Sequence, residues 1–541
     1  MFEAAVPSAA FIAIDLEMTG ITLNSNPFTK ISASDTPDVR YGKMQKVASQ
    51  YGIAQWGVCL FAEGQDSSGS GKRTYEVRPF NFYCFPRAHN DSFSQQLLID
   101  SSSMDFLRSH SFDFGRWMSK GISYLDAAGE RNLAESLFPT PQQLDPLDMP
   151  GRPQHKIELT RQDDISYLAN VMESVGAMLQ SGAKELVLPN CNTFLARAVR
   201  ETIEARFPHL IVETRPGKSR WIPQRVVLNL TVEEKQEREE RDKAAKRKVF
   251  REQVGLRRVW KMICKSRKPV VVHNGLYDLL FLYHRMEAPL PDGAAAFKKA
   301  KAALLPTTYD TKLLASHHPD KQFDSTGLED LTEQLAERSS LPVEFVMAEG
   351  FDTYRADAGN AKFHEAGYDA YVTGRLFAYF MADPGIPDVS VHANYLHLMR
   401  SLWDFNTNVE GDLVGEDRLI LDTDKGIILW LHGFEHAFNN TDFQRYFSDI
   451  SGEAGDALKP QFRWIDQSSM LFVVPGGRAV TLDGGEGLET ALREGLAKRG
   501  IGVDSLQDFV DRQKRQSRGG SSEGGEGGER PSKVLKTADS A

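Results

Sequence analysis

Short apolar runs rich in β-branched and aromatic residues divide the first part of the chain into strands. One run covers 11–16 and ends at acidic residues, and two more cover 54–61 and 74–83. The Gly/Ser-rich stretch 66–71 between the last two has the composition of a turn. The pattern therefore predicts a three-stranded meander, and residues 93–150 after it are expected to form helices and loops.

The character of the pattern changes between about 160 and 240. Residues 193–206 place apolar side chains at helical spacing, and short strands are expected at 210–214 and 225–230. Residues 231–258 are dense in charge, which is typical of a solvated helix with paired charges; the alternative is that part of it guides RNA. Strand and helix patterns then resume, with a strand at 269–272 that enters a helix, a strand and helix at 308–315, and a helix at 361–380.

Residues 416–510 form another unit, in which strands and helices alternate. The expected order is a strand at 426–431, a helix at 441–447, strands at 461–465 and 470–474, and a helix at 488–499. This β-α-β-β-α order favours an α+β sandwich of the RNA-recognition type.

Composition narrows the class of protein. A length of 541 residues favours three or four domains, and contents of 41% hydrophobic and 26% charged residues are those of a soluble globular protein. No apolar run approaches the length that spans a bilayer, and the N-terminus lacks the basic segment of a secretory signal. The four cysteines lie far apart without metal-site spacing, which suits a reducing compartment. The net charge of -10 argues against nonspecific coating of nucleic acid but leaves room for a local basic groove.

Four carboxylates and one histidine lie in three motifs. Asp15 and Glu17 end the first predicted strand, Asp278 lies on the helix that follows 269–272, and His364 and Asp369 lie at the start of the last helix. Hard divalent cations prefer oxygen ligands, and two-metal phosphoryl chemistry needs several carboxylates that converge. A histidine beside them can accept a proton. The combination predicts metal-dependent hydrolysis of a phosphodiester.

Each motif alone also has a simpler interpretation. Asp15 and Glu17 project from one face of a strand, but a strand-end acidic pair exposed to water has the same spacing. Asp278 alone is an acidic residue on a helix, which is usually a surface position. His364 and Asp369 are five residues apart and do not share one face of a regular helix, so we expect the histidine just before the helix or in its first turn. The specificity lies in the combination.

The three motifs resemble those of the DEDD superfamily of 3′-to-5′ exonucleases, which have a ribonuclease-H-like fold. In that superfamily the last Asp follows a Tyr by four residues or a His by five. Here Glu365 occupies the first position and His364 the second, so the chain is identified as a member of the His subclass. Over about residues 1–390 it further resembles the poly(A)-specific ribonuclease family, in the segments 15–21, 103–114, 121–125, 273–279, 309–312 and 364–371.

The resemblance implies an α/β fold class, in which a ribonuclease-H-like exonuclease core carries a small inserted nucleic-acid-binding domain and is followed by a C-terminal α+β RRM-like domain. The acidic motifs must come together, so the segment between them is expected to be looped out of one nuclease core. The expected domains are the first half of the core at 1–155, the inserted Arg-x-x-x-His-type domain at 156–245, the second half of the core at 246–395, the RRM-like domain at 410–512, and a disordered tail at 516–541.

Roles for individual residues also follow from the resemblance. Asp15, Glu17, Asp278 and Asp369 would hold two Mg²⁺ ions, with Mn²⁺ as a substitute, and His364 would accept the proton of the attacking water.

Further residues are candidates for substrate binding. Met18 and Ile21 lie where the family packs apolar side chains against the terminal bases, and ordinary core packing is the alternative. Asp310 and Lys312 are expected to support the site or the RNA backbone from outside the metal ligands.

The accessory domains contain two candidate stacking residues and one motif whose spacing differs from that of the family. Trp430 and Trp464 are candidates for stacking on a base or a methylguanosine cap, with core packing as the alternative. The inserted domain should separate its Arg and His by three residues, whereas Arg206 and His209 have only two between them.

The function implied is that of a metal-dependent 3′-to-5′ exoribonuclease that shortens the poly(A) tails of RNA, a deadenylase that releases 5′-AMP. One alternative is a trimmer of the 3′ ends of small or non-coding RNA, or a DNA-proofreading relative, and an alternative of another class is a catalytically silent RNA-binding protein. The expected partners are single-stranded RNA with a poly(A) 3′ tail, a 5′ cap and a second copy in a homodimer, with no membrane. The expected localisation is the nucleus and the cytoplasm, and the Lys/Arg content near Lys514 and at 530–536 is a weak nuclear signal.

Overall fold

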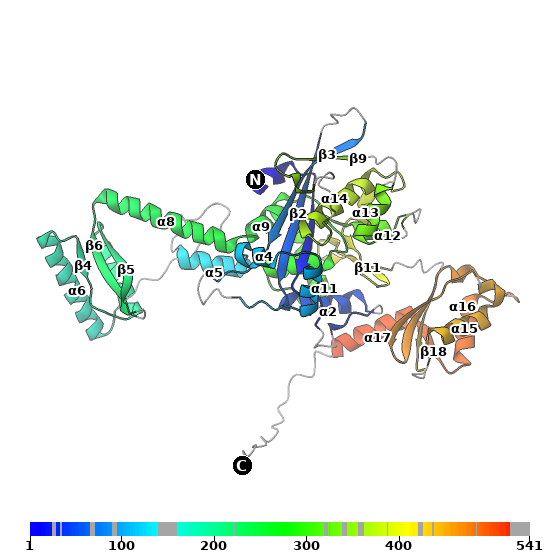
Figure 1. Cartoon of the computed structure of the whole chain (residues 1–541). Coiled ribbons are helices and arrows are strands. Elements are labelled where there is room, and N and C mark those ends of the chain that lie inside the picture. Colours follow the sequence, from blue (N-terminus) through cyan, green and yellow to red (C-terminus); the bar gives the residue numbers. More distant parts are fainter. Residues whose placement is uncertain are drawn as a thin grey trace, which may run out of the picture. The chain divides into compact units, whose positions relative to one another are not determined.

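The chain divides into two compact units in a computed structural model (Figure 1). One unit comprises Met1–Phe85, Gln95–Gly121 and Val259–Ala541, and the other comprises Pro86–Ser94 and Ile122–Arg258. The structure describes residues 1–23, 29–32, 35–64, 71–88, 95–138, 159–219, 222–318, 323, 325–337, 343–354, 362–386, 388–419, 426–434, 438–455, 457–482 and 484–519.

A six-stranded mixed sheet organises the first unit, with the strand order β8-β7-β1-β2-β3-β9. Its strands are β1 (Phe11–Met18), β2 (Ile53–Glu63), β3 (Arg73–Tyr83), β7 (Val270–Val272), β8 (Thr308–Asp310) and β9 (Val343–Met347). The predicted meander is confirmed, because β1, β2 and β3 pair antiparallel, while β7, β8 and β9 each pair parallel to their neighbours. The predicted turn at 66–71 lies outside the described residues except for Gly71. The mixed sheet with its helices confirms the α/β class.

Helices surround this sheet. They are α1 (Phe2–Ala5), α2 (Pro37–Gln50), α3 (Ser101–Ser109), α4 (Phe114–Lys120), α9 (Arg257–Ser266), α10 (Leu276–Met286), α11 (Ala294–Leu304), α12 (Thr311–Ser316), α13 (Leu328–Ala336) and α14 (Ala366–Ala382), with 3₁₀ turns at Val6–Ser8, Asp352–Tyr354 and Val389–His392. Short strands follow α14, namely β10 (Tyr395–Leu396), β11 (Trp403–Asn406), β12 (Val409–Glu410), β13 (Leu413–Val414) and β14 (Arg418–Leu419).

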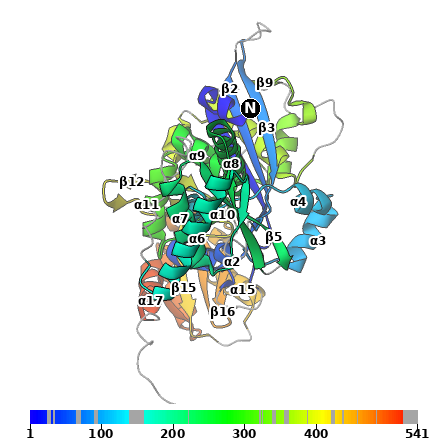
Figure 2. The same ribbon diagram turned by 90° about the vertical axis from the view of Figure 1, so that its left-hand side faces the viewer.

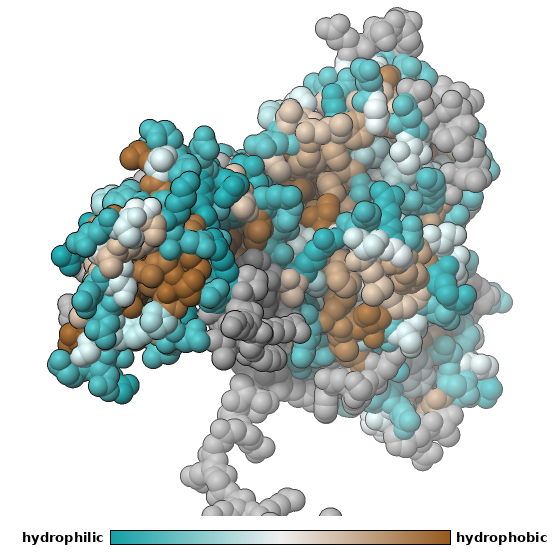
Figure 3. Space-filling model, turned by 60° about the vertical axis from the view of Figure 1, so that its left-hand side comes forward, coloured by the Kyte–Doolittle hydropathy of each residue, from teal (hydrophilic) through white to brown (hydrophobic). Residues whose placement is uncertain are grey.

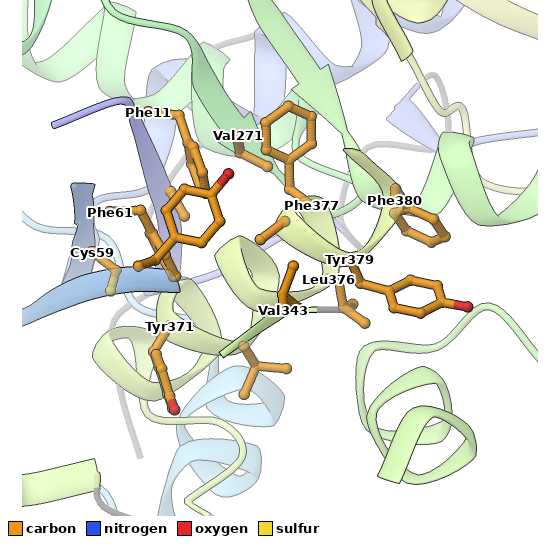
Figure 4. Close-up of a cluster of buried hydrophobic side chains, with 14 of the residues drawn as sticks. Phe11, Cys59, Phe61, Val271, Val343, Tyr371, Leu376, Phe377, Tyr379 and Phe380 are labelled. Atoms are coloured by element: carbon orange, nitrogen blue, oxygen red, sulfur yellow. The ribbon is translucent and has the colours of Figure 1, made fainter. Parts of the chain in front are cut away.

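The core of the unit lies where α14 packs across β1, β2 and β3. Phe11 stacks on Phe61 with ring centroids 4.7 Å apart and meets Phe377 of α14 edge-on at 5.0 Å (Figure 4). Val271 of β7 and Tyr371 of α14 belong to the same buried cluster. Burial of these large side chains fixes α14 on the sheet, because each contributes roughly 1.5–3 kcal/mol on leaving water. The helix therefore holds its first turn at a defined place over β1.

The second unit consists of a three-stranded sheet and four helices among its described residues. Its elements are α5 (Ala127–Leu137), α6 (Gln162–Ser181), β4 (Glu185–Val187), α7 (Thr193–Arg206), β5 (Leu210–Ser219), β6 (Ile222–Asn229) and α8 (Val232–Val254), and its strand order is β4-β6-β5. The predicted helices and two strands are present, but α6 and β4 were not predicted. Apolar side chains also reach the surface here, among them Ile165, Val187 and Phe194, and Figure 3 shows apolar patches on the face it presents.

This unit is larger than the expected insertion at 156–245. Its boundaries at Ile122 and Arg258 include α5, since Leu133 and Phe138 pack with Phe250 and Val254 of α8. A buried ion pair between Arg257 and Glu130, with Nε 2.6 Å from the carboxylate, joins the two ends of the segment. Periodicity alone could not reveal this contact, because its partners are more than a hundred residues apart.

A four-stranded antiparallel sheet with two helices on one face forms the C-terminal part. The elements are β15 (Ile427–His432), α15 (Asn440–Ser451), β16 (Gln461–Asp466), β17 (Ser469–Val474), α16 (Leu488–Ala497), β18 (Gly502–Ser505) and α17 (Leu506–Gly519), with strand order β16-β17-β15-β18 and 3₁₀ turns at Gly452–Gly455 and Gly477–Ala479. The predicted β-α-β-β-α order is present, and β18 and α17 add to it. Residues 516–519 of the expected disordered tail belong to α17, and 520–541 lie outside the described residues.

Among the described residues, no helix combines the length and the apolar character needed to cross a membrane.

Candidate functional site

The strand β1 carries the first two carboxylates on the face that α14 covers. Phe11 and Ala13 pack against α14, and side chains alternate along a strand, so Asp15 and Glu17 continue the same face toward its carboxyl end. Both acids are half-buried, and their neighbour Leu16 points the other way and is buried. The apolar half of the strand thus anchors the acidic half beside the start of α14.

Asp278 reaches the same place from α10. The strand β7 pairs with β1 only at Ile12 and Ala13, so the edge of β1 beyond that point is open to other donors and acceptors. The backbone N–H of Leu16 donates to the Asp278 carboxylate, which lies in the first turn of α10 and is 8% exposed. A helix N-terminus stabilises negative charge, so this position suits a buried carboxylate.

The last motif lies at the start of α14. Asp369 is in the first turn and is buried, and its Oδ2 accepts a hydrogen bond of 2.9 Å from the backbone N–H of His364. His364 precedes the helix with φ at 67°, a left-handed conformation that is uncommon outside glycine. This turn brings its ring back over the carboxylates, and ligand atoms of Glu17, His364 and Asp369 all lie within 4.8 Å of one another. The expected position of the histidine, just before the helix, is confirmed.

Burial and mutual repulsion raise the pKa of all four carboxylates at this site, so their charged forms are disfavoured. Burial, followed by the charges of Asp369 and Asp278, raises the pKa of Asp15 and of Glu17 well above the ordinary range. Burial raises the pKa of Asp278 and of Asp369 to about 7. Among the described residues, Asp278 Oδ1 and Asp369 Oδ1 are also buried without a hydrogen-bond partner. Four crowded oxygen donors of this kind are the donor set that a hard divalent cation prefers, so the residues fit such an ion.

The stability of the metal-free protein should therefore fall as the pH rises from about 4 to about 7. The folded state raises the pKa of these carboxylates, so in that window it binds more protons than the unfolded chain, and deprotonation costs stability. Thermal unfolding in EDTA across pH 4–8 measures the fall, and Mg²⁺ or Mn²⁺ at pH 7.5 should reverse it by several degrees. An unfolding midpoint that neither ion moves at pH 7.5 would contradict a metal site here.

Side chains of the neighbouring strands fix the turn before α14. Gln55 lies opposite Glu17 in the β1–β2 register, and its Oε1 accepts a 2.9 Å hydrogen bond from the backbone N–H of Ala366. Glu365 accepts from Asn81 Nδ2 at 3.0 Å and also from the hydroxyl of Tyr354. Sequence reasoning missed these residues, because Gln55 and Asn81 act through partners that are hundreds of residues away, and no local pattern pairs Tyr354 with Glu365. Only the β-pairing register could have indicated Gln55.

Gly57→Ala should disturb this turn. Gly57 faces Asp15 across the β-pairing, and a Cβ there would lie 1.8 Å from the carbonyl oxygen of Ala366. Backbone atoms must shift to relieve such a clash, so we expect a loss of stability of about 1–3 kcal/mol and at least a tenfold loss of activity. Thermal unfolding and a nuclease assay measure both. Gly42→Ala in α2 is the matched control, because nothing lies within 4 Å of its Cβ and it should be neutral or stabilising.

The four predicted substrate-binding residues of this unit have different environments. Met18 is half-buried, whereas Ile21 is 49% exposed beside the acidic strand end. Asp310 is 1% exposed, and its carboxylate accepts from the backbone N–H groups of Asn274, Lys312 and His397 at 2.8–3.0 Å. The Nζ of Lys312 donates to the carbonyl of Thr326 at 3.0 Å. Asp310 thus holds the loop between β7 and α10, and Ile21 is the most accessible of the four.

The two predicted stacking tryptophans lie in the C-terminal part, away from the carboxylate cluster in sequence. Trp430 on β15 is 7% exposed; Phe509 and Arg512 of α17 cover it, with Arg512 5.0 Å from the ring centroid. Trp464 on β16 is half-buried, and its Nε1 donates to Asn440 Oδ1 at 2.6 Å. Stacking on a base or cap stays a prediction for both.

Comparison with known proteins places this site in a family. The model of the CAF1 family ribonucleases matches residues 1–377. Poly(A)-specific ribonuclease PARN of Xenopus laevis is 31% identical over 383 residues, which cover 69% of this chain and 59% of that protein. The PARN of Homo sapiens is 33% identical over 384 residues, with 69% and 58% covered. The pre-piRNA 3′-exonuclease trimmer of Bombyx mori is 25% identical over 392 residues, with 69% and 67% covered. The match thus spans less than two thirds of the length of the two ribonucleases.

Proposed function

The chain belongs to the CAF1 family of ribonucleases, and we propose that it is a metal-dependent 3′-to-5′ exoribonuclease that shortens the poly(A) tails of RNA and releases 5′-AMP. One observation carries the proposal, namely the convergence of the carboxylates of β1, α10 and α14 beneath His364. The poly(A) substrate is supported by the names of the relatives at 31–33% identity. The RNA-trimming alternative is less supported, because its relative is 25% identical.

The residues would divide the reaction as follows. Asp15, Glu17, Asp278 and Asp369 would hold the cations, which we propose to be two Mg²⁺ ions. Ions bound there would lower the pKa of a water and would stabilise negative charge on the departing 3′ oxygen. His364 accepts the proton of the attacking water. Burial and the neighbouring His110 lower the pKa of His364, so its ring is neutral and ready to accept a proton near pH 7.

The accessory parts complete the proposal. We propose that the core has the ribonuclease-H-like arrangement, that the unit containing α6, α7 and α8 binds nucleic acid, and that the C-terminal sheet is RRM-like. The RRM-like assignment is supported by the four-stranded antiparallel sheet of the C-terminal part, which has two helices on one face. Homodimer formation, binding of a 5′ cap, and localisation to the nucleus and cytoplasm stay predictions.

A gel time course tests the function. RNA labelled at the 5′ end carries a 3′ oligo(A) tail in one sample and a mixed-sequence tail in the other, each with Mg²⁺ or EDTA. The proposal expects a Mg²⁺-dependent ladder that shortens the oligo(A) tail and stalls in mixed sequence. Equal loss of both tails would move the function to general 3′ trimming. No shortening with either tail would overturn the nuclease proposal in favour of a silent RNA-binding protein.

A further inference from the structure

Three aromatic rings meet at the mouth of the carboxylate site. The ring of His110 lies against the ring of His364, with centroids 4.1 Å apart and planes at 62°. Phe106 contacts both of them, at 4.8 Å from His364 and 4.3 Å from His110. Phe106 is 43% exposed and His110 is exposed, so these two rings stand between His364 and solvent.

The helix α3 carries Phe106 and is followed directly by His110, and it is attached to the acidic strand β1. Thr19, one residue after the end of β1, donates from its hydroxyl to the carbonyl of Leu98 at 2.7 Å, and its own carbonyl accepts from the backbone N–H of Asp100 at 2.8 Å. Asp100 caps α3 by accepting from the N–H of Ser103 at 3.0 Å. At the other end of α3, Leu107 is buried in a cluster with Trp117 of α4, and α3 and α4 lie next to each other (Figure 2). The position of α3 relative to the site is thus fixed at both ends.

His110 itself is held in one orientation. Its Nδ1 lies 2.8 Å from the carbonyl oxygen of Phe106, one helical turn earlier, and a carbonyl can only accept, so Nδ1 carries the proton. Its backbone N–H also donates to the carbonyls of Phe106 and Leu107 at 3.2 Å. An exposed histidine ring that is fixed in this way can support a neighbour.

His364 needs such support. Its backbone is in the left-handed region, which is uncommon outside glycine. Its backbone N–H is tied to Asp369 by the 2.9 Å hydrogen bond described above. That bond fixes the backbone of His364 but leaves the rotation of its ring open. The rings of His110 and Phe106 are in contact with it and restrict that rotation.

We infer that His110 is a positioning residue of this ribonuclease, which holds the imidazole of His364 over the carboxylates by ring packing. The inference rests on the proposed function, because it takes His364 as the proton acceptor. Positioning of a catalytic group affects the chemical step more than substrate binding, since a displacement of about 1 Å can cost on the order of a hundredfold in rate.

The experiment compares kcat and KM of the full-length protein and of His110→Ala and His110→Phe on oligo(A)-tailed RNA with Mg²⁺. His110→Ala should lower kcat about tenfold or more and change KM less than twofold. His110→Phe keeps a ring at this position and should recover most of kcat, which a proton-transfer role of His110 would not allow. Asp105→Ala is the control on the same helix, because its ion pair with Arg108 is exposed and contributes little.

The inference would be overturned by a kcat of His110→Ala within twofold of that of the unsubstituted protein, or by a His110→Phe variant as slow as His110→Ala. Thermal unfolding of each variant shows whether the fold is intact; a His110→Ala variant that loses activity only in proportion to its unfolded fraction also counts against positioning. Failure of the proposed function would give a different result: the protein without a substitution would not shorten the RNA, or His364→Ala would keep full activity.

Discussion

Asp278→Asn is expected to lower kcat on oligo(A)-tailed RNA by on the order of a thousandfold or more. The amide keeps the shape of the side chain but removes one of the four charges that are proposed to hold the cations. The same substitution should raise the unfolding temperature in EDTA at pH 7.5, because it removes a buried carboxylate whose Oδ1 has no partner among the described residues. Loss of activity with gain of metal-free stability is the signature of a functional acid rather than a structural one.

Asp310→Asn is the contrasting control for this prediction. Asp310 lies at the end of β8, next to the strand that leads to Asp278, and it is also buried. Its two oxygens accept three backbone hydrogen bonds, and an amide nitrogen in place of one oxygen would face a donor. We expect a loss of stability of roughly 1–3 kcal/mol in EDTA, opposite in sign to Asp278→Asn. If Asp278→Asn loses stability as Asp310→Asn does, the carboxylate of Asp278 is not under electrostatic strain.

The sequence predicted what depends on local spacing. Asp15 and Glu17 share a face because they are two residues apart on an apolar strand. His364 and Asp369 are five residues apart, a spacing that does not place two side chains on one face of a regular helix, so the histidine was expected to precede the helix. The β-α-β-β-α order of the C-terminal part follows from alternation and helical periodicity in the same way. The resemblance added which residues belong together, since no local pattern joins Asp278 to a strand more than two hundred residues earlier.

What sequence reasoning could not find depends on register and on tertiary packing. Gln55 binds the start of α14 because β2 pairs with β1 in one particular register, and nothing in its own neighbourhood distinguishes it. The inserted unit is longer than expected because α5 packs on α8 through side chains that are ordinary in sequence. The strand β18 (Gly502–Ser505) lacks alternation of apolar and polar residues, and it forms because β15 offers it a free edge.

His364→Ala tests the second large effect and decides between two roles for the histidine. As the proton acceptor it should contribute on the order of a hundredfold to ten-thousandfold to kcat, and Glu365 at the alternative position cannot replace it, because its carboxylate is bound to Asn81 and Tyr354. The side chain of His364 also lies within 4.8 Å of Glu17 and Asp369, so it is close enough to be a cation ligand instead. The two roles differ in metal-linked stability, measured by thermal unfolding with Mg²⁺ or EDTA at pH 7.5. A proton acceptor leaves the stabilisation by Mg²⁺ intact in His364→Ala, whereas Asp278→Asn should lose most of it. If His364→Ala loses the stabilisation as completely as Asp278→Asn, the histidine is a ligand, and the assignment of the proton acceptor is wrong.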